Sequence, residues 1–127
     1  MKEVRIAIAG LGNRGWSLMR KAVMPIEGVR VVGLCDIYED RIQRAREYVV
    51  ENQGDEPVCN TDWKAMLTEA RPEMALVSTG WEAHIEIALW CMEQGIVPVV
   101  EVGGAYSAEE CSALVDTHER TGTRIML

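Results

Sequence analysis

Short apolar runs alternate with longer amphipathic stretches along the whole chain. The apolar runs, rich in Val and Ile, predict strands at residues 4–9, 29–35, 57–59, 74–78, 97–100 and 123–127. The stretches between them carry apolar residues at helical spacing and predict helices at residues 14–24, 38–52, 62–69, 82–94 and 107–120. Alternation of this kind is typical of a parallel sheet covered by helices on both faces. The pattern therefore predicts an α/β fold with a doubly wound parallel sheet of about six strands.

Local signals mark where these helices begin and end. Ser107 followed three residues later by Glu110 has the spacing of a capping box, which satisfies free amide groups at a helix start. Either Thr61 or Asp62 could cap the helix at residues 62–69 in a similar way. Gly122 ends the last predicted helix, as glycine commonly does where the backbone turns left-handed.

Length and charge narrow the function classes. The chain has 127 residues, the size of one domain that buries a core without disulfides. Its formal net charge of -7 disfavours nucleic acids and anionic membranes as partners, because both require clustered Lys and Arg. No run approaches the ~18 apolar residues of a membrane span, and the segment after Met1 lacks a signal-peptide pattern. We therefore expect a cytoplasmic protein with no nucleic-acid and no membrane partner.

The cysteines and histidines show no metal or redox pattern. The four cysteines, at positions 35, 59, 91 and 111, include no C-x-x-C pair and are predicted to be reduced core residues. His118 lies seven residues after Cys111 on the same predicted apolar stripe, so we expect it to be partly buried. The sequence predicts no metal site.

Residues 10–15 read G-L-G-N-R-G and match the pattern G-x-G-x-x-G between a predicted strand and a predicted helix. In such a loop Gly10 permits the tight turn, Gly12 lets the backbone approach a diphosphate, and Gly15 allows the helix to pack closely on the strand. Free amides at the helix start then bind phosphate oxygens. Arg14 either contacts phosphate or is solvated. The motif predicts a Rossmann-type dinucleotide-binding domain.

Asp36 stands at the end of the second predicted strand, 21 residues past Gly15. A carboxylate there accepts hydrogen bonds from the adenosine ribose, and its charge repels the extra phosphate of NADP. The predicted cofactor is therefore NAD, with NADP less favoured. In the alternative interpretation the glycines only form a turn and Asp36 caps the next helix, which leaves their joint spacing unexplained.

Residues 78–84 read S-T-G-W-E-A-H. With the preceding features, they make essentially the whole chain resemble the Gfo/Idh/MocA family of NAD(P)-dependent oxidoreductases. Members typically carry T-P-x-x-x-H here, and this sequence keeps Thr79 and His84 but has Gly80 in place of Pro. The resemblance implies a Rossmann domain followed by an α+β domain that supplies the substrate pocket and most acid/base groups.

After the fifth strand the family typically carries E-K-P, whose Lys contacts substrate and assists proton transfer. The corresponding residues here are Glu101, Val102 and Gly103. The E-V pair and Trp81 are similar to those of NAD-dependent α-N-acetylgalactosaminidase-like glycoside hydrolases, although Pro usually replaces Gly103 there. In that group NAD takes and returns a hydride at sugar C3, so the glycosidic bond is cleaved without net oxidation.

The resemblance implies an enzyme acting on a sugar, by glycosidase chemistry or, alternatively, as a sugar or polyol dehydrogenase. The missing Lys at Val102 disfavours the dehydrogenase. A non-catalytic NAD-binding sensor module and an S-adenosylmethionine-dependent methyltransferase are further alternatives, because one fold serves many functions.

Ligands of open α/β sheets bind outside the carboxyl ends of the strands, where these motifs fall. Trp81 either shields the cofactor or packs at a helix entry. His84 is either a weak candidate for a catalytic group or a structural hydrogen-bond partner. The predicted cofactor-binding residues are Gly10, Gly12, Asn13, Arg14, Gly15, Asp36, Ser78, Thr79, Gly80, Trp81, His84 and Glu101.

The last predicted strand reaches the end of the chain without a polar tail. We therefore expect residues 1–127 to form one Rossmann domain, with the α+β substrate domain absent. Such a fragment is expected to bind the cofactor without catalysing turnover. A homo-oligomer is compatible with this arrangement.

Overall fold

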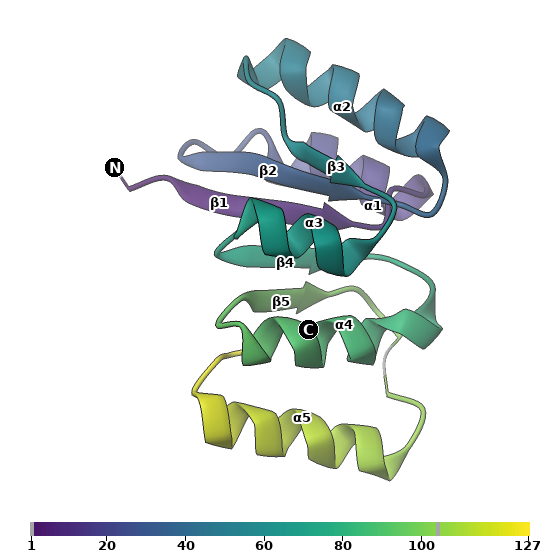
Figure 1. Ribbon diagram of the computed structural model, residues 1–127, viewed down its shortest axis with the longest axis vertical. Helices are drawn as coiled ribbons and strands as arrows, with labels where there is room; N and C mark the ends of the chain where they lie inside the picture. The colour runs from purple at the N-terminus through teal and green to yellow at the C-terminus, as the bar shows by residue number, and fades with distance from the viewer. Residues whose placement is uncertain (1, 104) are drawn as a thin grey trace.

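The computed structural model describes residues 2–103 and 105–127, which form one parallel sheet with helices on both faces (Figure 1). Five strands follow the order β3-β2-β1-β4-β5, and every pairing is parallel. The strands are β1 (Val4–Ala9), β2 (Val29–Cys35), β3 (Val58–Asn60), β4 (Met74–Val77) and β5 (Val97–Val100). The helices are α1 (Asn13–Leu18), the π-helical η1 (Met19–Val23), α2 (Glu39–Gln53), α3 (Trp63–Ala70), α4 (Trp81–Glu93) and α5 (Ala108–Thr121).

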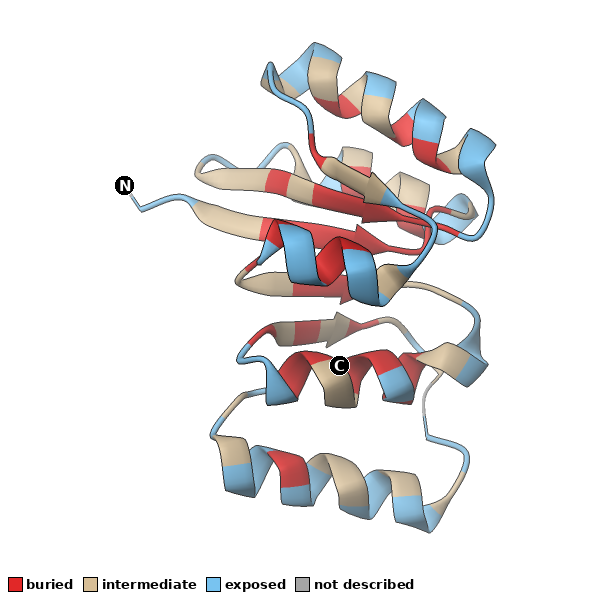
Figure 2. Cartoon of the chain, viewed as in Figure 1, coloured by how far each residue is buried: buried red, intermediate tan, exposed pale blue. Residues whose placement is uncertain are grey.

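The core consists of two apolar clusters, one on each face of the sheet. Along β1, Ile6 and Ile8 belong to the cluster with α1, η1 and α2, whereas Ala7 belongs to the cluster with α3 and α4. This alternation follows from the two-residue period of a strand. Figure 1 shows α1 behind the sheet and α3 in front of it, and Figure 2 shows the buried residues concentrated in the central strands. The predicted doubly wound fold is confirmed.

The register of the sheet brings the ends of four strands to one edge. Ala9 on β1 pairs with both Cys35 on β2 and Val77 on β4, and Val77 pairs with Val100 on β5. The residue that follows the end of each of these four strands is a predicted site residue. Four predicted site residues therefore lie at the same edge of the sheet. They are Gly10, Asp36, Ser78 and Glu101.

The predicted sixth strand at residues 123–127 is reduced to a single parallel bridge between Val99 and Met126. The Met126 amide donates to the Pro98 carbonyl at 2.9 Å, and the Val100 amide donates to the Met126 carbonyl at 2.8 Å. The segment therefore lies where a sixth strand belongs but pairs at one position.

Most predicted helix boundaries agree with the structure, and the caps explain them. Asp62, one of the two predicted candidates, caps α3 by accepting from the amides of Lys64 and Ala65 at 2.9 and 3.3 Å. Ser107 caps α5 by accepting from the Glu110 amide at 3.1 Å. The Glu110 carboxylate in turn accepts from the Tyr106 amide at 2.7 Å. In the usual capping box it would accept from the amide of the cap residue itself, here Ser107. The predicted first helix changes to π-helical hydrogen bonding at Met19.

Two predictions on α5 are wrong: Cys111 and His118 are exposed. Instead of packing closely on the sheet, α5 leaves a hollow of about 500 Å³ that Cys111, Leu114 and Val99 help to line. The sheet therefore covers only part of the apolar stripe that the spacing predicts on α5. By contrast Cys35 and Cys91 are buried, and burial raises the pKa of each thiol to about 12.

Within the described part of the chain, no helix combines the length and apolar character needed to cross a membrane.

Candidate functional site

The glycine loop forms a tight corner between β1 and α1. Gly10 has φ of +100°, a conformation that favours glycine, and its amide donates to the Cys35 carbonyl at 2.9 Å. A Cβ on Gly10 would lie 2.5 Å from the carbonyl carbon and oxygen of Ser78. A side chain at position 10 would therefore force β1 and β4 apart at their carboxyl ends.

Gly12 leaves the start of α1 open. No side chain caps the helix, and no acidic residue lies in its first turn. A Cβ on Gly12 would meet only the Arg41 guanidinium, at an ordinary contact distance of 3.5 Å. Helix starts with free amides attract anions because the amide dipoles point outward. The corner, called the cradle below, thus presents an uncapped helix start whose polarity suits an anion.

Gly15 and Ser78 fasten this cradle to the sheet. A Cβ on Gly15 would collide with the Gly10 carbonyl oxygen and lie 2.6 Å from the Ser78 hydroxyl. The Ser78 hydroxyl donates to the Gly10 carbonyl at 2.9 Å. The close approach of helix to strand expected for the third glycine is therefore present. Ser78 contributes by holding the loop in place.

Asp36 lies directly against the glycine corner. Its side chain is buried, with a relative exposure of 6%, and Oδ2 accepts from the Leu11 amide at 2.7 Å. Oδ1 accepts from the amide of Tyr38, the residue that precedes α2, at 2.9 Å. A carboxylate has about four acceptor positions, so these two bonds leave capacity for further donors. The alternative in which Asp36 caps α2 is wrong, because the N-cap residue is Tyr38 and no side chain caps this helix. The ribose-binding interpretation stays a prediction.

Arg41 completes the polar end of the site. Its guanidinium lies 3.7 Å from Asp36 Oδ2 and stacks on the Tyr38 ring at 4.7 Å. Stacking engages the face of the guanidinium and leaves its in-plane N–H groups available for hydrogen bonds. Arg41 was not among the predicted site residues, although its position in the first turns of the helix after Asp36 was a usable signal.

A cleft of about 410 Å³ opens at this edge of the sheet, within the size range of small-molecule sites. Among its lining residues are the predicted residues Gly10, Gly12, Asn13, Arg14, Asp36, Ser78, Thr79 and Gly80. Arg41, Thr61 and Trp63 also line it and were not predicted. Thr61 and Trp63 follow the short edge strand β3, and their position opposite the glycine loop depends on the sheet order β3-β2-β1, which sequence spacing does not reveal.

Four predicted residues lie outside the lining of this cleft, each in a different setting. Gly15 is buried behind the cradle, and Trp81 is 58% exposed at the start of α4. The His84 ring is only 1% exposed, with Nδ1 2.9 Å from the Gly103 carbonyl and Nε2 2.9 Å from the Thr79 carbonyl. A neutral imidazole has one N–H donor, so one ring nitrogen donates to a backbone carbonyl and the other lies in contact with the second carbonyl. His84 thus contacts backbone instead of facing a substrate.

Glu101, the fourth of these residues, forms an ion pair with Arg14, whose Nε lies 3.3 Å from Glu101 Oε2. The Arg14 side chain is 63% exposed and the Glu101 side chain 24% exposed, so solvent weakens the attraction. The pair joins the first turn of α1 to the end of β5. Because Arg14 lines the cleft, its ion pair with Glu101 holds Glu101 beside the cleft.

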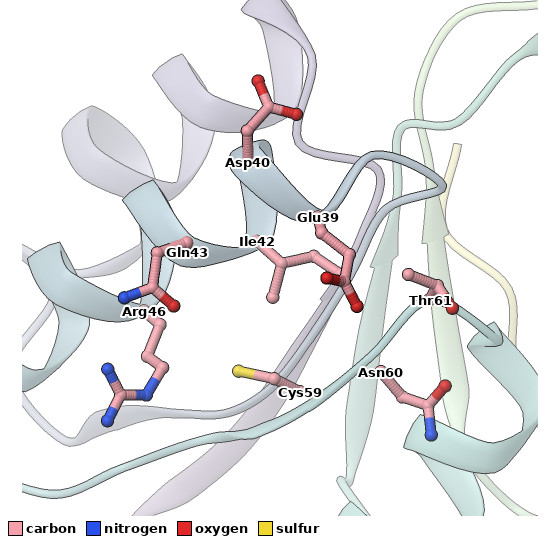
Figure 3. A pocket seen from close by; sticks show the side chains of 8 residues that line it. All are labelled: Glu39, Asp40, Ile42, Gln43, Arg46, Cys59, Asn60 and Thr61. Atoms are coloured by element: carbon pink, nitrogen blue, oxygen red, sulfur yellow. The ribbon is translucent and has the colours of Figure 1, made fainter.

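A second cavity, of about 420 Å³, lies between α2 and β3 (Figure 3). Cys59 on β3 faces the side chains of α2, and Arg46 is already paired with Glu56. Thr61 is the only lining residue that this cavity shares with the cleft. It contains none of the predicted site residues.

Comparison with known proteins identifies the family. The family model described as "Oxidoreductase family, NAD-binding Rossmann fold" matches residues 4–127. A glycosyl hydrolase family 109 protein of Akkermansia muciniphila is 35% identical over 100% of this chain and 27% of its own length. An alpha-N-acetylgalactosaminidase of Bacteroides fragilis is 35% identical over 98% of this chain and 30% of its own length. The chain thus spans less than a third of these curated relatives.

Solved structures show the same fold. A myo-inositol 2-dehydrogenase from Lactobacillus plantarum superposes with a TM-score of 0.85 at 20% identity, covering 98% of this chain and 36% of that protein. The WlbA dehydrogenase from Bordetella pertussis, solved with NADH and UDP-GlcNAcA, superposes at 0.84 with 17% identity, covering 98% and 36%. The chain belongs to the Gfo/Idh/MocA oxidoreductase family, of which it is the NAD-binding Rossmann domain.

Proposed function

We propose that the cleft binds NAD with the diphosphate on the free amides at the start of α1 and the adenosine ribose on Asp36. The observation that carries this proposal is the 2.7 Å hydrogen bond from the Leu11 amide to Asp36 Oδ2. With this bond the carboxylate and the amide corner lie side by side. A ribose and the diphosphate attached to it need two neighbouring binding groups of this kind. Gly12 supports this proposal, because only the Arg41 guanidinium lies within 4 Å of its Cβ position, at 3.5 Å.

The charge of Asp36 favours NAD over NADP. A buried carboxylate beside the ribose repels a second phosphate group, and its acceptor positions suit hydroxyl donors. The Arg41 guanidinium lies 3.7 Å from Asp36 and offsets part of this negative charge. The same guanidinium also lies over the Tyr38 ring, which holds it beside the carboxylate. We therefore propose that Asp36 sets the preference and that Arg41 orients the carboxylate.

We propose that the whole protein acts on a sugar. Bound NAD supplies reversible hydride transfer, and this domain's residues would hold and orient the cofactor. Names of relatives that include both an alpha-N-acetylgalactosaminidase and a myo-inositol 2-dehydrogenase support a sugar or polyol substrate. Glycosidase chemistry without net oxidation is the favoured form, because Val102 is 80% exposed and carries no proton-transfer group.

We further propose that an α+β domain beyond these residues supplies the substrate pocket, so the isolated domain binds NAD but does not turn over substrate. The relatives' greater length supports this division. A homo-oligomer of the whole protein is compatible with it.

A binding experiment tests the proposal against its alternatives. NAD, NADH, NADPH and S-adenosylmethionine are titrated separately into the protein and followed by calorimetry. NAD and NADH are expected to bind, NADPH more weakly, and S-adenosylmethionine not at all. Binding of S-adenosylmethionine, or preference for NADPH, would overturn the assignment.

A further inference from the structure

Two side chains in the first turn of α4 contact the loop after β5. Trp81 and His84, three residues apart, lie on one side of the helix because of its 3.6-residue period. Both reach Gly103, two residues past Glu101. Neither of these contacts with Gly103 involves the cradle around Gly12. They must therefore be explained separately from diphosphate binding.

Trp81 lies across the backbone of Gly103. A Cβ on Gly103 would lie 2.5 Å from Trp81 Nε1 and 2.6 Å from its Cδ1 and Cε2 atoms. Gly103 also has φ of +94°, which proline cannot adopt because its ring fixes φ near about −65°. The glycine therefore meets two requirements together: a left-handed backbone and an indole ring in contact with it.

His84 connects the same loop to the opposite wall of the site. One ring nitrogen faces the Gly103 carbonyl and the other faces the Thr79 carbonyl, both at 2.9 Å. Thr79 lines the cleft, and Glu101 contacts Arg14 at its edge. The buried imidazole thus lies between the loop after β4 and the loop after β5, donating to one carbonyl and packing against the other.

We propose that Trp81, His84 and Gly103 form one positioning unit, which holds the loop after β5 against α4 and so places Glu101 opposite Arg14. The inference deepens the proposed NAD function, on which its cofactor-binding consequence rests. It makes position 103 specific for glycine: a larger residue displaces Trp81, and the loop then moves away from the cleft. The three are positioning residues, because none of them lines the cleft itself.

A double-mutant cycle tests the contact between Trp81 and Gly103. Gly103→Ala is expected to weaken NADH binding by about tenfold, the scale of coupling between residues in contact. In a Trp81→Ala background the same substitution should change affinity by less than about threefold, because the ring is gone and only the backbone strain at φ of +94° remains. Gly95→Ala is the matched control, since Gly95 has φ of +75° and nothing within 4 Å of its Cβ position.

Amide hydrogen exchange of the peptide covering residues 99–106 gives a readout that needs no cofactor. Exchange should accelerate in Gly103→Ala and in His84→Leu but not in Gly95→Ala. His84→Gln, whose side-chain NH₂ group can still donate to a backbone carbonyl, should restore part of the protection. Equal effects of Gly103→Ala in both backgrounds, or unchanged exchange in His84→Leu, would overturn the proposal. Absence of NADH binding to the unmodified chain would contradict the proposed function, while the exchange experiment would still decide on the positioning unit.

Discussion

The Leu11 amide donates a 2.7 Å hydrogen bond to Asp36 Oδ2, and this bond joins the glycine corner to the end of β2. Because Asp36 also accepts from the Tyr38 amide, one carboxylate fixes the loop after β1 and the start of α2 together. The fold itself therefore holds the carboxylate beside the glycine corner. Preorganisation of this kind reduces the conformational cost of binding.

Asp36→Asn should weaken NAD binding by about tenfold or more, since a hydrogen bond to a charged group contributes about 1.5–3 kcal/mol. The amide keeps one acceptor oxygen for the backbone but loses the charge. The substitution should also reduce the preference for NAD over NADP, because repulsion of the extra phosphate disappears. Calorimetry with both cofactors measures each effect. Asp40→Asn, with the same charge change at an exposed position on α2, is the control. Unchanged NAD affinity in Asp36→Asn would refute the ribose-binding role.

Gly15→Ala should destabilise the domain by about 1–3 kcal/mol, as overpacking of a filled site does. The added methyl group would collide with the Gly10 carbonyl and with the Ser78 hydroxyl. Urea denaturation measures the loss. Gly54→Ala is the comparison, because Gly54 has open space around its Cβ position and carries only backbone strain from φ of +100°. An effect of Gly15→Ala no larger than that of Gly54→Ala would show that the corner is loosely packed.

Thiol reactivity should separate the four cysteines by burial. Cys111 is exposed and should react first with iodoacetamide, whereas burial raises the pKa of Cys35 and Cys91 to about 12. At pH 8 these two buried thiols are almost entirely protonated, and the thiolate is the reactive form. Mass spectrometry of peptides after timed alkylation provides the measurement. Modification of Cys91 as fast as Cys111 in the folded protein would contradict the packing of α4.

The same two pKa shifts predict how stability depends on pH. A thiol whose pKa rises from 9.0 in the unfolded chain to about 12 in the fold binds its proton more tightly when folded. Its contribution to stability is complete below pH 9.0 and is lost as the pH rises toward 12. Urea denaturation at pH 8 and pH 10 should show lower stability at pH 10, with a smaller difference in Cys91→Ala. An identical difference in both proteins would assign the pH dependence to other groups.

Sequence spacing predicted what local chemistry determines and missed what the sheet order determines. The glycine corner, Asp36 and the Asp62 cap all depend on short-range rules of turns and helix starts. Thr61 and Trp63 reach the cleft only because β3 lies next to β2 at the sheet edge, a long-range result. The exposure of Cys111 likewise depends on how far α5 lies from the sheet, which no periodicity encodes.

The central claim is that NAD lies across the corner beside Asp36. The most direct test is a titration of the isotope-labelled protein with NADH, followed by backbone amide chemical shifts. Shifts are expected at Gly12, Asn13 and Arg14, near Asp36 and at residues 78–80, and they should be clearly smaller in Asp36→Asn at the same subsaturating NADH concentration. Shifts confined to the cavity between α2 and β3, or no shifts at the glycine corner at saturation, would contradict the account.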